Sequence, residues 1–143
     1  MDLFGEQWSN HHEKIKNHWF DQVGYDDVVV VAGDISWAST FEEALPDLDW
    51  LDQLPGSKVI IKGNHDYWWG GISQLHERLP SSLFPLHNNS VELGEYCFFG
   101  SRLWDDSVVP QGGSVEKMLN REVERLKLSI ASMSESCRQL KKI

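Results

Sequence analysis

The sequence predicts an α/β fold, and three features of the chain support this prediction. Residues 28–32 (VVVVA) and 58–62 (KVIIK) are short runs rich in β-branched residues, and each is followed by a glycine. Between them, residues 40–53 carry apolar side chains at helical spacing. A strand, a helix and a second strand in this order are typical of a βαβ unit with a parallel strand pair.

The helix before this unit and the elements within it are each predicted from their own sequence pattern. A helix is expected over residues 9–21, with Ser9 as its N-cap. Apolar residues recur along one side of it: Trp8, Ile15, Trp19 and Val23. The run at 28–32 is continuously apolar, which is typical of a strand buried on both faces. The helix at 40–53 contains Pro46, so we expect it to start late or to bend there.

Three further elements follow the unit. A short helix is expected over residues 71–79, and a hairpin of two strands over 91–100, turning at Gly94–Glu95. Residues 114–143 predict a long amphipathic helix with a serine cap and a break near 132–136. Its apolar stripe is Val115, Leu119, Val123, Leu126, Ile130, Met133, Cys137 and Leu140. The near-heptad spacing also allows a coiled coil, but the run is short and packing against the core is favoured.

The composition excludes several classes of protein. The chain has 143 residues, 41% of them hydrophobic, with seven Trp, which excludes a disordered chain. Low Gly, Pro and Cys contents exclude collagen-like and disulfide-rich scaffolds. The chain has neither the apolar run of a membrane helix nor the pattern of a signal peptide. We therefore expect a single cytoplasmic domain, with Cys97 and Cys137 as free thiols.

The charge is unevenly distributed along the chain. The formal net charge is −9, and there is no Lys or Arg between Asn17 and Ser57. Nonspecific nucleic-acid binding depends on cations that meet phosphates, so no nucleic-acid patch is expected. The acidic stretch could suit a cation site, although a solvated acidic surface is the favoured interpretation.

Polar side chains follow both predicted strands. A Gly-Asp pair follows the first strand and Gly-Asn-His-Asp follows the second. Ligands of open α/β sheets bind outside the carboxyl ends of the strands, so Asp34, Asn64, His65 and Asp66 should converge on one crevice. Each motif alone is common in turns, but the two together, one crossover apart, favour a functional site.

The side chains of these four residues indicate which chemistry the crevice could perform. Asp34 could bridge two metal ions, and Asn64 offers a neutral oxygen ligand; such ligands suit Mn, Fe, Zn or Mg. His65 could be a ligand or a proton donor, and Asp66 could hold its imidazole. Two metal ions about 3.5–4 Å apart would clamp an in-line displacement at phosphorus.

The motifs Gly33-Asp34 and Gly63-Asn64-His65-Asp66 resemble motifs two and three of the calcineurin-like metallophosphoesterases. The stretches GDISWA, EALPDLDWL, LPGSKVIIKGNHDYWW and NREVERLKLS resemble a bacterial Ser/Thr-phosphatase-like subgroup. The resemblance implies an α/β/β/α sandwich, two divalent metal ions and a phosphate-ester substrate. It implies that Asp34 bridges the metals and that Asn64 binds the second metal and approaches the phosphate. It also implies that His65, oriented by Asp66, donates a proton to the leaving oxygen or stabilises it.

The family's first motif, Asp-x-His, and its later motif, Gly-His-x-His, do not occur in this sequence. We therefore expect residues 1–143 to form a single incomplete domain, a partial sandwich that is inactive alone. A complementing chain or a second copy would supply the missing ligands. The alternative is a non-enzymatic remnant or a small interaction module. An unrelated nucleotide-binding fold is disfavoured, because there is no Gly-rich phosphate loop.

Three residues near the motifs have less certain roles. Trp68 and Trp69 could line the crevice, but packing in the core is the favoured interpretation. Arg102 could reach a phosphate, but a surface position is more usual for an arginine.

Overall fold

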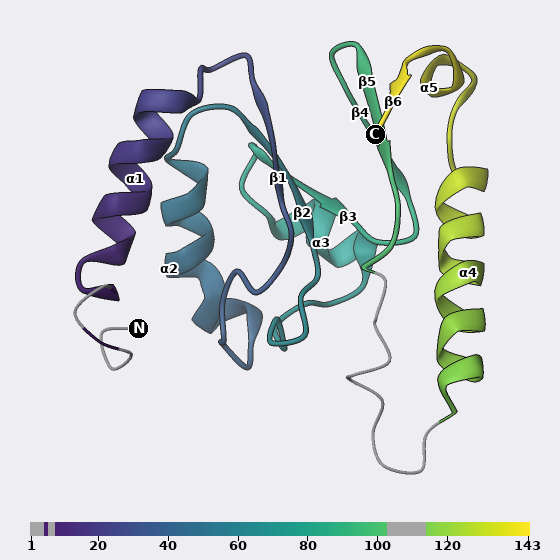
Figure 1. Cartoon of the computed structure of the whole chain (residues 1–143), viewed down its shortest axis with the longest axis horizontal. Helices are drawn as coiled ribbons and strands as arrows, with labels where there is room; N and C mark the ends of the chain where they lie inside the picture. The colour runs from purple at the N-terminus through teal and green to yellow at the C-terminus, as the bar shows by residue number, and fades with distance from the viewer. Residues whose placement is uncertain (1–4, 6–7, 103–113) are drawn as a thin grey trace.

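A computed structural model describes residues 5, 8–102 and 114–143 of the chain. Within these residues the chain forms a mixed α/β fold with two three-stranded sheets and flanking helices (Figure 1). None of the helices in the described part is long and apolar enough to cross a membrane. The α/β class is therefore confirmed, while the four-layer sandwich stays a prediction.

The first sheet is entirely parallel and has the order β1-β2-β3. Its strands are β1 (Val28–Val31), β2 (Ser57–Ile61) and β3 (Leu83–Leu86). The βαβ prediction is confirmed, because β1 pairs in parallel with β2 and Val30 lies opposite Val59. The prediction that β1 is buried on both faces was wrong. Its residues are half-buried or exposed, because β1 lies at the edge of the sheet.

Helix α2 (Phe41–Asp52) crosses from β1 to β2 and begins with a complete capping box. The Thr40 hydroxyl accepts a hydrogen bond from the backbone N–H of Glu43, and the Glu43 carboxylate accepts one from the backbone N–H of Thr40. These caps satisfy two donors that the first turn leaves unpaired. The helix therefore starts where the pattern begins and runs through Pro46. Of the two alternatives expected for Pro46, the late start was wrong, and the bend stays a prediction.

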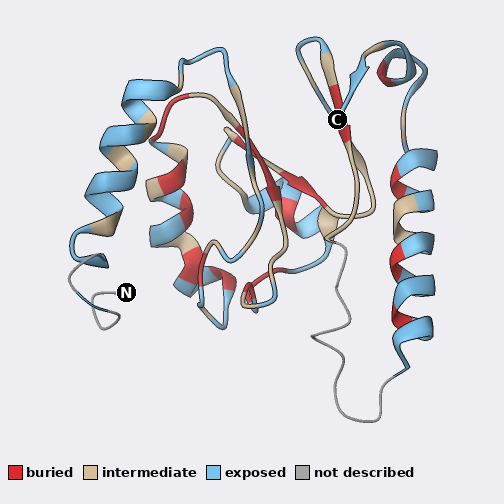
Figure 2. Cartoon of the chain, viewed as in Figure 1, coloured by how far each residue is buried: buried red, intermediate tan, exposed pale blue. Residues whose placement is uncertain are grey.

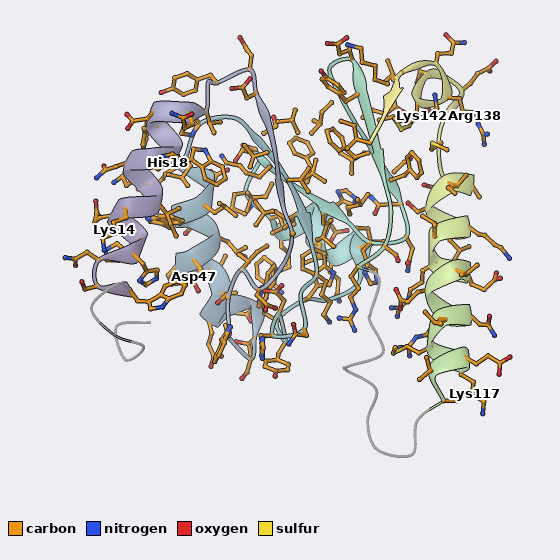
Figure 3. The ribbon with its side chains drawn as sticks, viewed as in Figure 1. Lys14, His18, Asp47, Lys117, Arg138 and Lys142 are labelled. Carbon is orange, nitrogen blue, oxygen red and sulfur yellow. A yellow bond between two sulfur atoms is a disulfide. The ribbon has the colours of Figure 1, made fainter. Side chains whose placement is uncertain are left out.

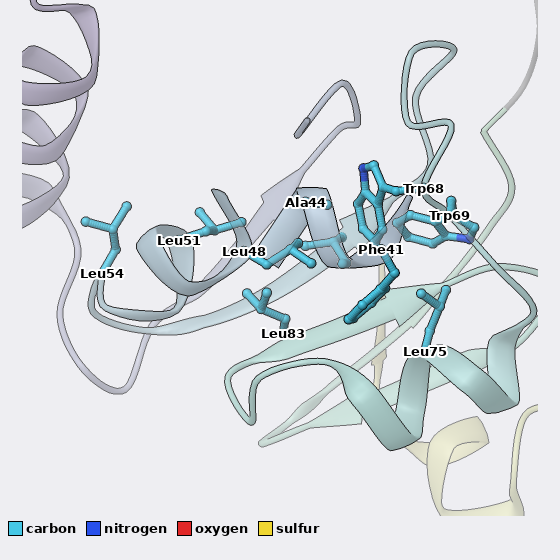
Figure 4. Close-up of a cluster of buried hydrophobic side chains, with 10 residues drawn as sticks. Phe41, Ala44, Leu48, Leu51, Leu54, Trp68, Trp69, Leu75 and Leu83 are labelled. Atoms are coloured by element: carbon cyan, nitrogen blue, oxygen red, sulfur yellow. The ribbon is translucent and has the colours of Figure 1, made fainter. Parts of the chain in front are cut away.

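The main hydrophobic core lies between α2, the central strand β2 and α3 (Ile72–Arg78) (Figure 4). Trp68 and Trp69, which follow β2, are both buried in this core, as predicted. The Phe41 ring meets Trp68 edge-on, with ring centroids 5.9 Å apart. The core thus anchors both ends of the segment that carries Asn64, His65 and Asp66.

Helix α1 (His11–Gln22) lies beside α2 and has no buried residue. Its N-cap is Asn10, in the left-handed region at φ 53°, instead of the predicted Ser9. Trp19 joins α1 to the core region: it packs against the main core, and its indole N–H donates to the carbonyl of Pro55 over 2.9 Å. Left-handed backbone is tolerated by Asn more readily than by most residues, which explains the shift of the cap.

The second sheet has the order β4-β5-β6, with β4 (Ser90–Leu93), β5 (Tyr96–Phe99) and β6 (Lys141–Lys142). The predicted hairpin is confirmed, because β4 and β5 pair antiparallel around Gly94–Glu95. A second core joins the two sheets and consists of Val59, Leu86, Val91 and Phe98.

The predicted C-terminal helix is interrupted and ends before the end of the chain. It forms α4 (Val115–Ala131) and α5 (Glu135–Gln139), with the break inside the predicted interval. The prediction that its whole apolar stripe packs against the core was wrong, since Val115, Leu119 and Val123 are 41%, 49% and 48% exposed. The buried side, which faces the sheets in Figure 2, carries Met118, Glu122 and Ser129 instead. Ser129 explains this docking: its hydroxyl donates to the carbonyl of Asn89 and accepts from the N–H of Gly100.

Cys97 on β5 and Cys137 on α5 form a disulfide, with their Cα atoms 5.3 Å apart. The prediction of free thiols was wrong, because the break after α4 turns the chain back and brings α5 against β5. Disulfides persist mainly in oxidising compartments, so at the predicted cytoplasmic location this bond would be reduced.

Reduction of this disulfide is expected to lower the free energy of unfolding by about 2–4 kcal/mol, because the bond closes a long loop in the unfolded chain. The loop joins residues 40 positions apart. Urea unfolding with and without dithiothreitol measures the change, and Cys137→Ser should be insensitive to the reductant. Two titratable thiols per chain in denatured, unreduced protein would contradict this bond.

Candidate functional site

The two strand-end turns meet through their glycines. Gly33 follows β1 with φ +99°, and a Cβ built on it would lie 2.6 Å from the Cα of Gly63, which follows β2. A Cβ on Gly63 would lie 2.9 Å from Cγ of Asp34. No side chain fits at either position, so the backbones approach closely enough to bring Asp34 against Asn64–His65. The predicted convergence at the carboxyl ends of β1 and β2 is therefore present in the structure.

Asp34 lies in the left-handed region at φ 54° and is held by the turn of the second motif. Its Oδ1 accepts a hydrogen bond from the backbone N–H of His65 over 3.0 Å, and its Oδ2 lies 3.2 Å from Nδ1 of the His65 imidazole. The side chain is 43% exposed. A carboxylate that is held in place and still partly exposed is suited to accept a cation.

The Asp34 carboxyl is expected to titrate below its ordinary pKa of 3.8. The backbone N–H of His65 is the main cause of this lowered pKa, and it outweighs the opposing effect of burial. A lowered carboxyl pKa stabilises the fold above the ordinary value, and this contribution is lost as the pH falls through the lowered pKa. A ¹³C NMR titration measures the midpoint, and His65→Ala, which keeps the backbone N–H, should retain most of the effect. A midpoint at or above 3.8 would contradict this electrostatic description of the site.

His65 lies between polar and aromatic neighbours. The amide nitrogen of Asn64 is 3.0 Å from Nδ1 of His65. The Trp37 ring stacks on the imidazole, with centroids 4.6 Å apart, and the Tyr67 ring meets it edge-on at 6.3 Å. Both aromatic side chains are more than 60% exposed. Sequence reasoning missed these two residues, although an aromatic side chain within three residues after each motif was the available signal.

Asp66 is placed differently from Asp34. It is fully buried, and its two oxygens accept five hydrogen bonds from N–H groups. The donors are the backbones of Asp34, Ile35, Ser36 and Gly63 and the indole of Trp68, over 2.7–3.0 Å. The resemblance implied that Asp66 orients His65, but none of these five hydrogen bonds comes from the His65 imidazole. Asp66 instead ties the turn after β1 to the turn after β2, while Asp34 is the carboxylate that contacts the imidazole.

A cavity of about 600 Å³ opens beside Asp34, between α1, the end of β1 and α2. Its lining includes His11, Trp19, Asp34 and Asp47, and Figure 3 shows Asp47 on the side of α2 that faces α1. Pockets of this size hold small ligands in other proteins. A larger cavity of about 790 Å³ lies along β1 and the hairpin, but it contains none of the four motif residues. Of the four motif residues, only Asp34 lines the 600 Å³ cavity, and we therefore place the candidate site at the edge of this cavity.

The donor types at this edge fit a divalent cation, but their number does not complete a dinuclear centre. Asp34, Asn64 and His65 supply a carboxylate, an amide and an imidazole, which are ligands of Mn, Fe, Zn and Mg sites. The described residues contain no group of three or more His, Cys, Asp or Glu placed to hold a metal ion. We therefore assign no step of chemistry to a metal within this part of the chain.

Arg102 lies close to the site rather than on the open surface. Its Nη1 donates to the carbonyl of Gly63 over 3.3 Å, and the side chain is only partly exposed. The hydrogen bond places the guanidinium next to the turn that presents Asn64 and His65. Arg102 is half-buried, so the favoured surface position is only partly confirmed, and contact with a phosphate stays a prediction.

A parallel sheet whose carboxyl edge gathers an aspartate, an asparagine and a histidine beside a cavity is typical of an α/β enzyme or ligand-binding domain. The family model described as calcineurin-like phosphoesterase matches residues 7–130. This match covers most of the 143 residues, and the chain belongs to the calcineurin-like phosphoesterase family, a group of hydrolases.

Two curated relatives are phage proteins. The chain is 50% identical over 48 residues to the gene 66 protein of Mycobacterium phage D29, which covers 34% of this chain and 24% of that protein. It is 41% identical over 56 residues to the gene 66 protein of Mycobacterium phage L5, covering 39% and 27% respectively. The matched segment thus spans about a quarter of each relative. No solved structure matches the chain.

Proposed function

We propose that this chain carries part of a metal-dependent phosphoesterase centre. Asp34 and Asn64 would hold divalent cations, Mn, Fe, Zn or Mg, and His65 would protonate the leaving oxygen of a phosphate ester. When bound, such cations activate the attacking water and neutralise charge on the phosphoryl group. The observation that supports this proposal best is the meeting of these three side chains at one sheet edge, beside the 600 Å³ cavity.

The proposal includes a second source of ligands. The described residues supply too few donors for two cations, so a complementing chain or a second copy of this chain would complete the centre. Residues 1–143 would then act as one incomplete domain of an α/β/β/α sandwich, in the cytoplasm. A single copy is expected to be inactive, because cation affinity depends on the number and charge of the ligands.

Hydrolysis of p-nitrophenyl phosphate and bis-p-nitrophenyl phosphate with added Mn²⁺ tests the proposal. We expect turnover whose specific rate rises with protein concentration, as association of two copies requires. His65→Ala should reduce this rate by about 100-fold, the scale of a lost general acid. His76→Ala changes an exposed histidine on α3, outside the site, and should leave the rate within about twofold.

The alternative is a non-enzymatic interaction module. Folded protein that shows no turnover at any concentration would favour this alternative. Turnover that is equal in the parent and in His65→Ala would exclude the proposed role of His65. The first outcome contradicts the proposed activity, and the second contradicts only the proposed role of His65.

A further inference from the structure

The outer face of the β4–β5 hairpin is covered by residues 132–143, which we call the strap. On the inner face, Val91 pairs with Phe98, and both belong to the core that joins the two sheets. Alternate residues of a strand lie on opposite faces, so the next pair, Glu92 and Cys97, lies on the outer face. Cys97 is nevertheless fully buried, because the strap folds back over this face and bonds to it (Figure 1).

The strap ends in strand β6, which pairs with β5 at the surface of the molecule. The backbone N–H of Lys141 donates to the carbonyl of Glu95 over 3.0 Å, and that of Ile143 donates to the carbonyl of Cys97 over 3.1 Å. The carbonyl of Ile143 accepts from the N–H of Phe99 over 3.1 Å. Lys141 and Glu95 also form an ion pair whose side chains are more than 60% exposed. An ion pair this exposed adds little to the stability of a two-residue strand.

Helix α5, the other element of the strap, has only five residues. The hydroxyls of Ser134 and Ser136 donate to the two carboxylate oxygens of Glu92, and these contacts are exposed. A helix this short is not stable alone in water. Of the twelve strap residues, all of which the structure describes, Cys137 is the one that is buried. The bond from Cys137 to Cys97 is therefore the main attachment of the strap to the hairpin.

We propose that the Cys97–Cys137 disulfide is a redox switch, which holds the strap on the hairpin when oxidised and releases it when reduced by a dithiol. Reduction breaks the S–S bond and forms two thiols. The two electrons and two protons come from the dithiol, which itself becomes a disulfide. Without the bond, the surface contacts of the strap do not offset the conformational entropy that its docking costs. This proposal does not depend on the proposed phosphoesterase function.

Release of the strap changes the surface of the hairpin. Ile143 lines the cavity of about 790 Å³ along β1 and the hairpin, so the released chain loses part of that wall. The Lys141 ammonium lies 5.3 Å from the centre of the Tyr96 ring, so release also uncovers this ring. At the predicted cytoplasmic location, where the bond would be reduced, the released state is the expected one.

The burial of both cysteines determines how the switch is reached. Cys97 and Cys137 are both 0% exposed, so a dithiol attacks the bond only after the strap opens locally. Reduction by dithiothreitol should therefore be slower by about tenfold or more in the folded protein than in urea. Thiol counting during the reaction measures both rates. Equal rates would contradict this route to the bond and the docked position of the strap.

Order parameters from ¹⁵N NMR relaxation of the full chain, with and without dithiothreitol, test the switch. In the oxidised protein, residues 134–143 should have order parameters near about 0.85, and reduction should lower them below about 0.6. Those of β2 should stay near about 0.85 in both states, because release of the strap leaves the first sheet folded. A reduced protein whose strap stays ordered would overturn the proposal, as would loss of order in β2 together with the strap.

Two variants separate the disulfide from the other contacts of the strap. Cys137→Ser should have a mobile strap without reductant, and dithiothreitol should not change it further. Glu95→Gln removes the exposed ion pair but keeps the disulfide, so its strap should stay ordered until it is reduced. Release of the strap in oxidised Glu95→Gln would show that surface contacts, and not the disulfide, hold it, and would overturn the proposal. The reduced parent gives the decisive comparison if Cys137→Ser does not fold.

Discussion

Asp66→Ala is expected to lower the free energy of unfolding by about 4 kcal/mol or more, and much of the protein should be unfolded if its total stability is modest. The substitution leaves five N–H donors without their acceptor, four of them from the backbone of the two strand-end turns. Each buried donor that loses its partner costs about 1–3 kcal/mol, and water entering the space offsets part of this sum. The effect should therefore exceed that of any ordinary surface substitution.

Urea unfolding measures this effect, and two further variants define its cause. Asp66→Asn keeps the shape of the side chain but turns an amide NH₂ toward N–H donors, so a loss of about 2–3 kcal/mol is expected. Asp49→Asn changes an exposed aspartate on α2 and should cost less than about 0.5 kcal/mol. A stability of Asp66→Ala within about 1 kcal/mol of the parent would show that this carboxylate does not hold the turns together.

Gly63→Ala is expected to cost about 2–3 kcal/mol and to displace Asp34 from its contacts with His65. The added Cβ would lie far inside the contact distance of the Asp34 backbone and carboxylate, so one of the two strand-end turns must move. The obstacle is steric, since Gly63 does not have a positive φ. The same change should also remove cation binding at Asp34.

Gly71→Ala is the matched control for this variant. A Cβ at Gly71 meets nothing within 4 Å, and the residue has φ −69°, which alanine adopts without strain. We expect a change of about 1 kcal/mol or less, the usual scale at an N-cap. Equal stabilities of Gly63→Ala and Gly71→Ala would contradict the close approach of the two turns.

The sequence predicted the βαβ unit because its signals are local and agree with one another. Apolar runs of strand length end at glycines, and the helix between them has an apolar face. Convergence of Asp34, Asn64 and His65 then follows from the topology of parallel strands. What the pattern could not give was the direction of each side chain: Asp66 turns inward to the backbone donors, although its position next to His65 suggested a direct contact.

Other elements were missed for definite physical reasons. Strand β3 contains Pro85, which argues against a strand unless the strand lies at a sheet edge, as β3 does. The amphipathic pattern of α4 marks an apolar stripe but does not say which face docks; hydrogen bonds of Ser129 decide this. The disulfide depends on a chain reversal after α4 that spacing alone does not indicate.

The central claim is that the two strand-end turns bring Asp34, Asn64 and His65 together as the cation-binding part of a phosphoesterase centre. Paramagnetic broadening of ¹H–¹⁵N NMR signals by substoichiometric Mn²⁺ tests it most directly, because it locates the ion without requiring turnover. The account predicts that signals of residues 33–36 and 63–67 broaden first, and that Asp34→Asn abolishes this while Asp49→Asn does not. Broadening centred on the acidic face of α2, or equal broadening in Asp34→Asn, would contradict it.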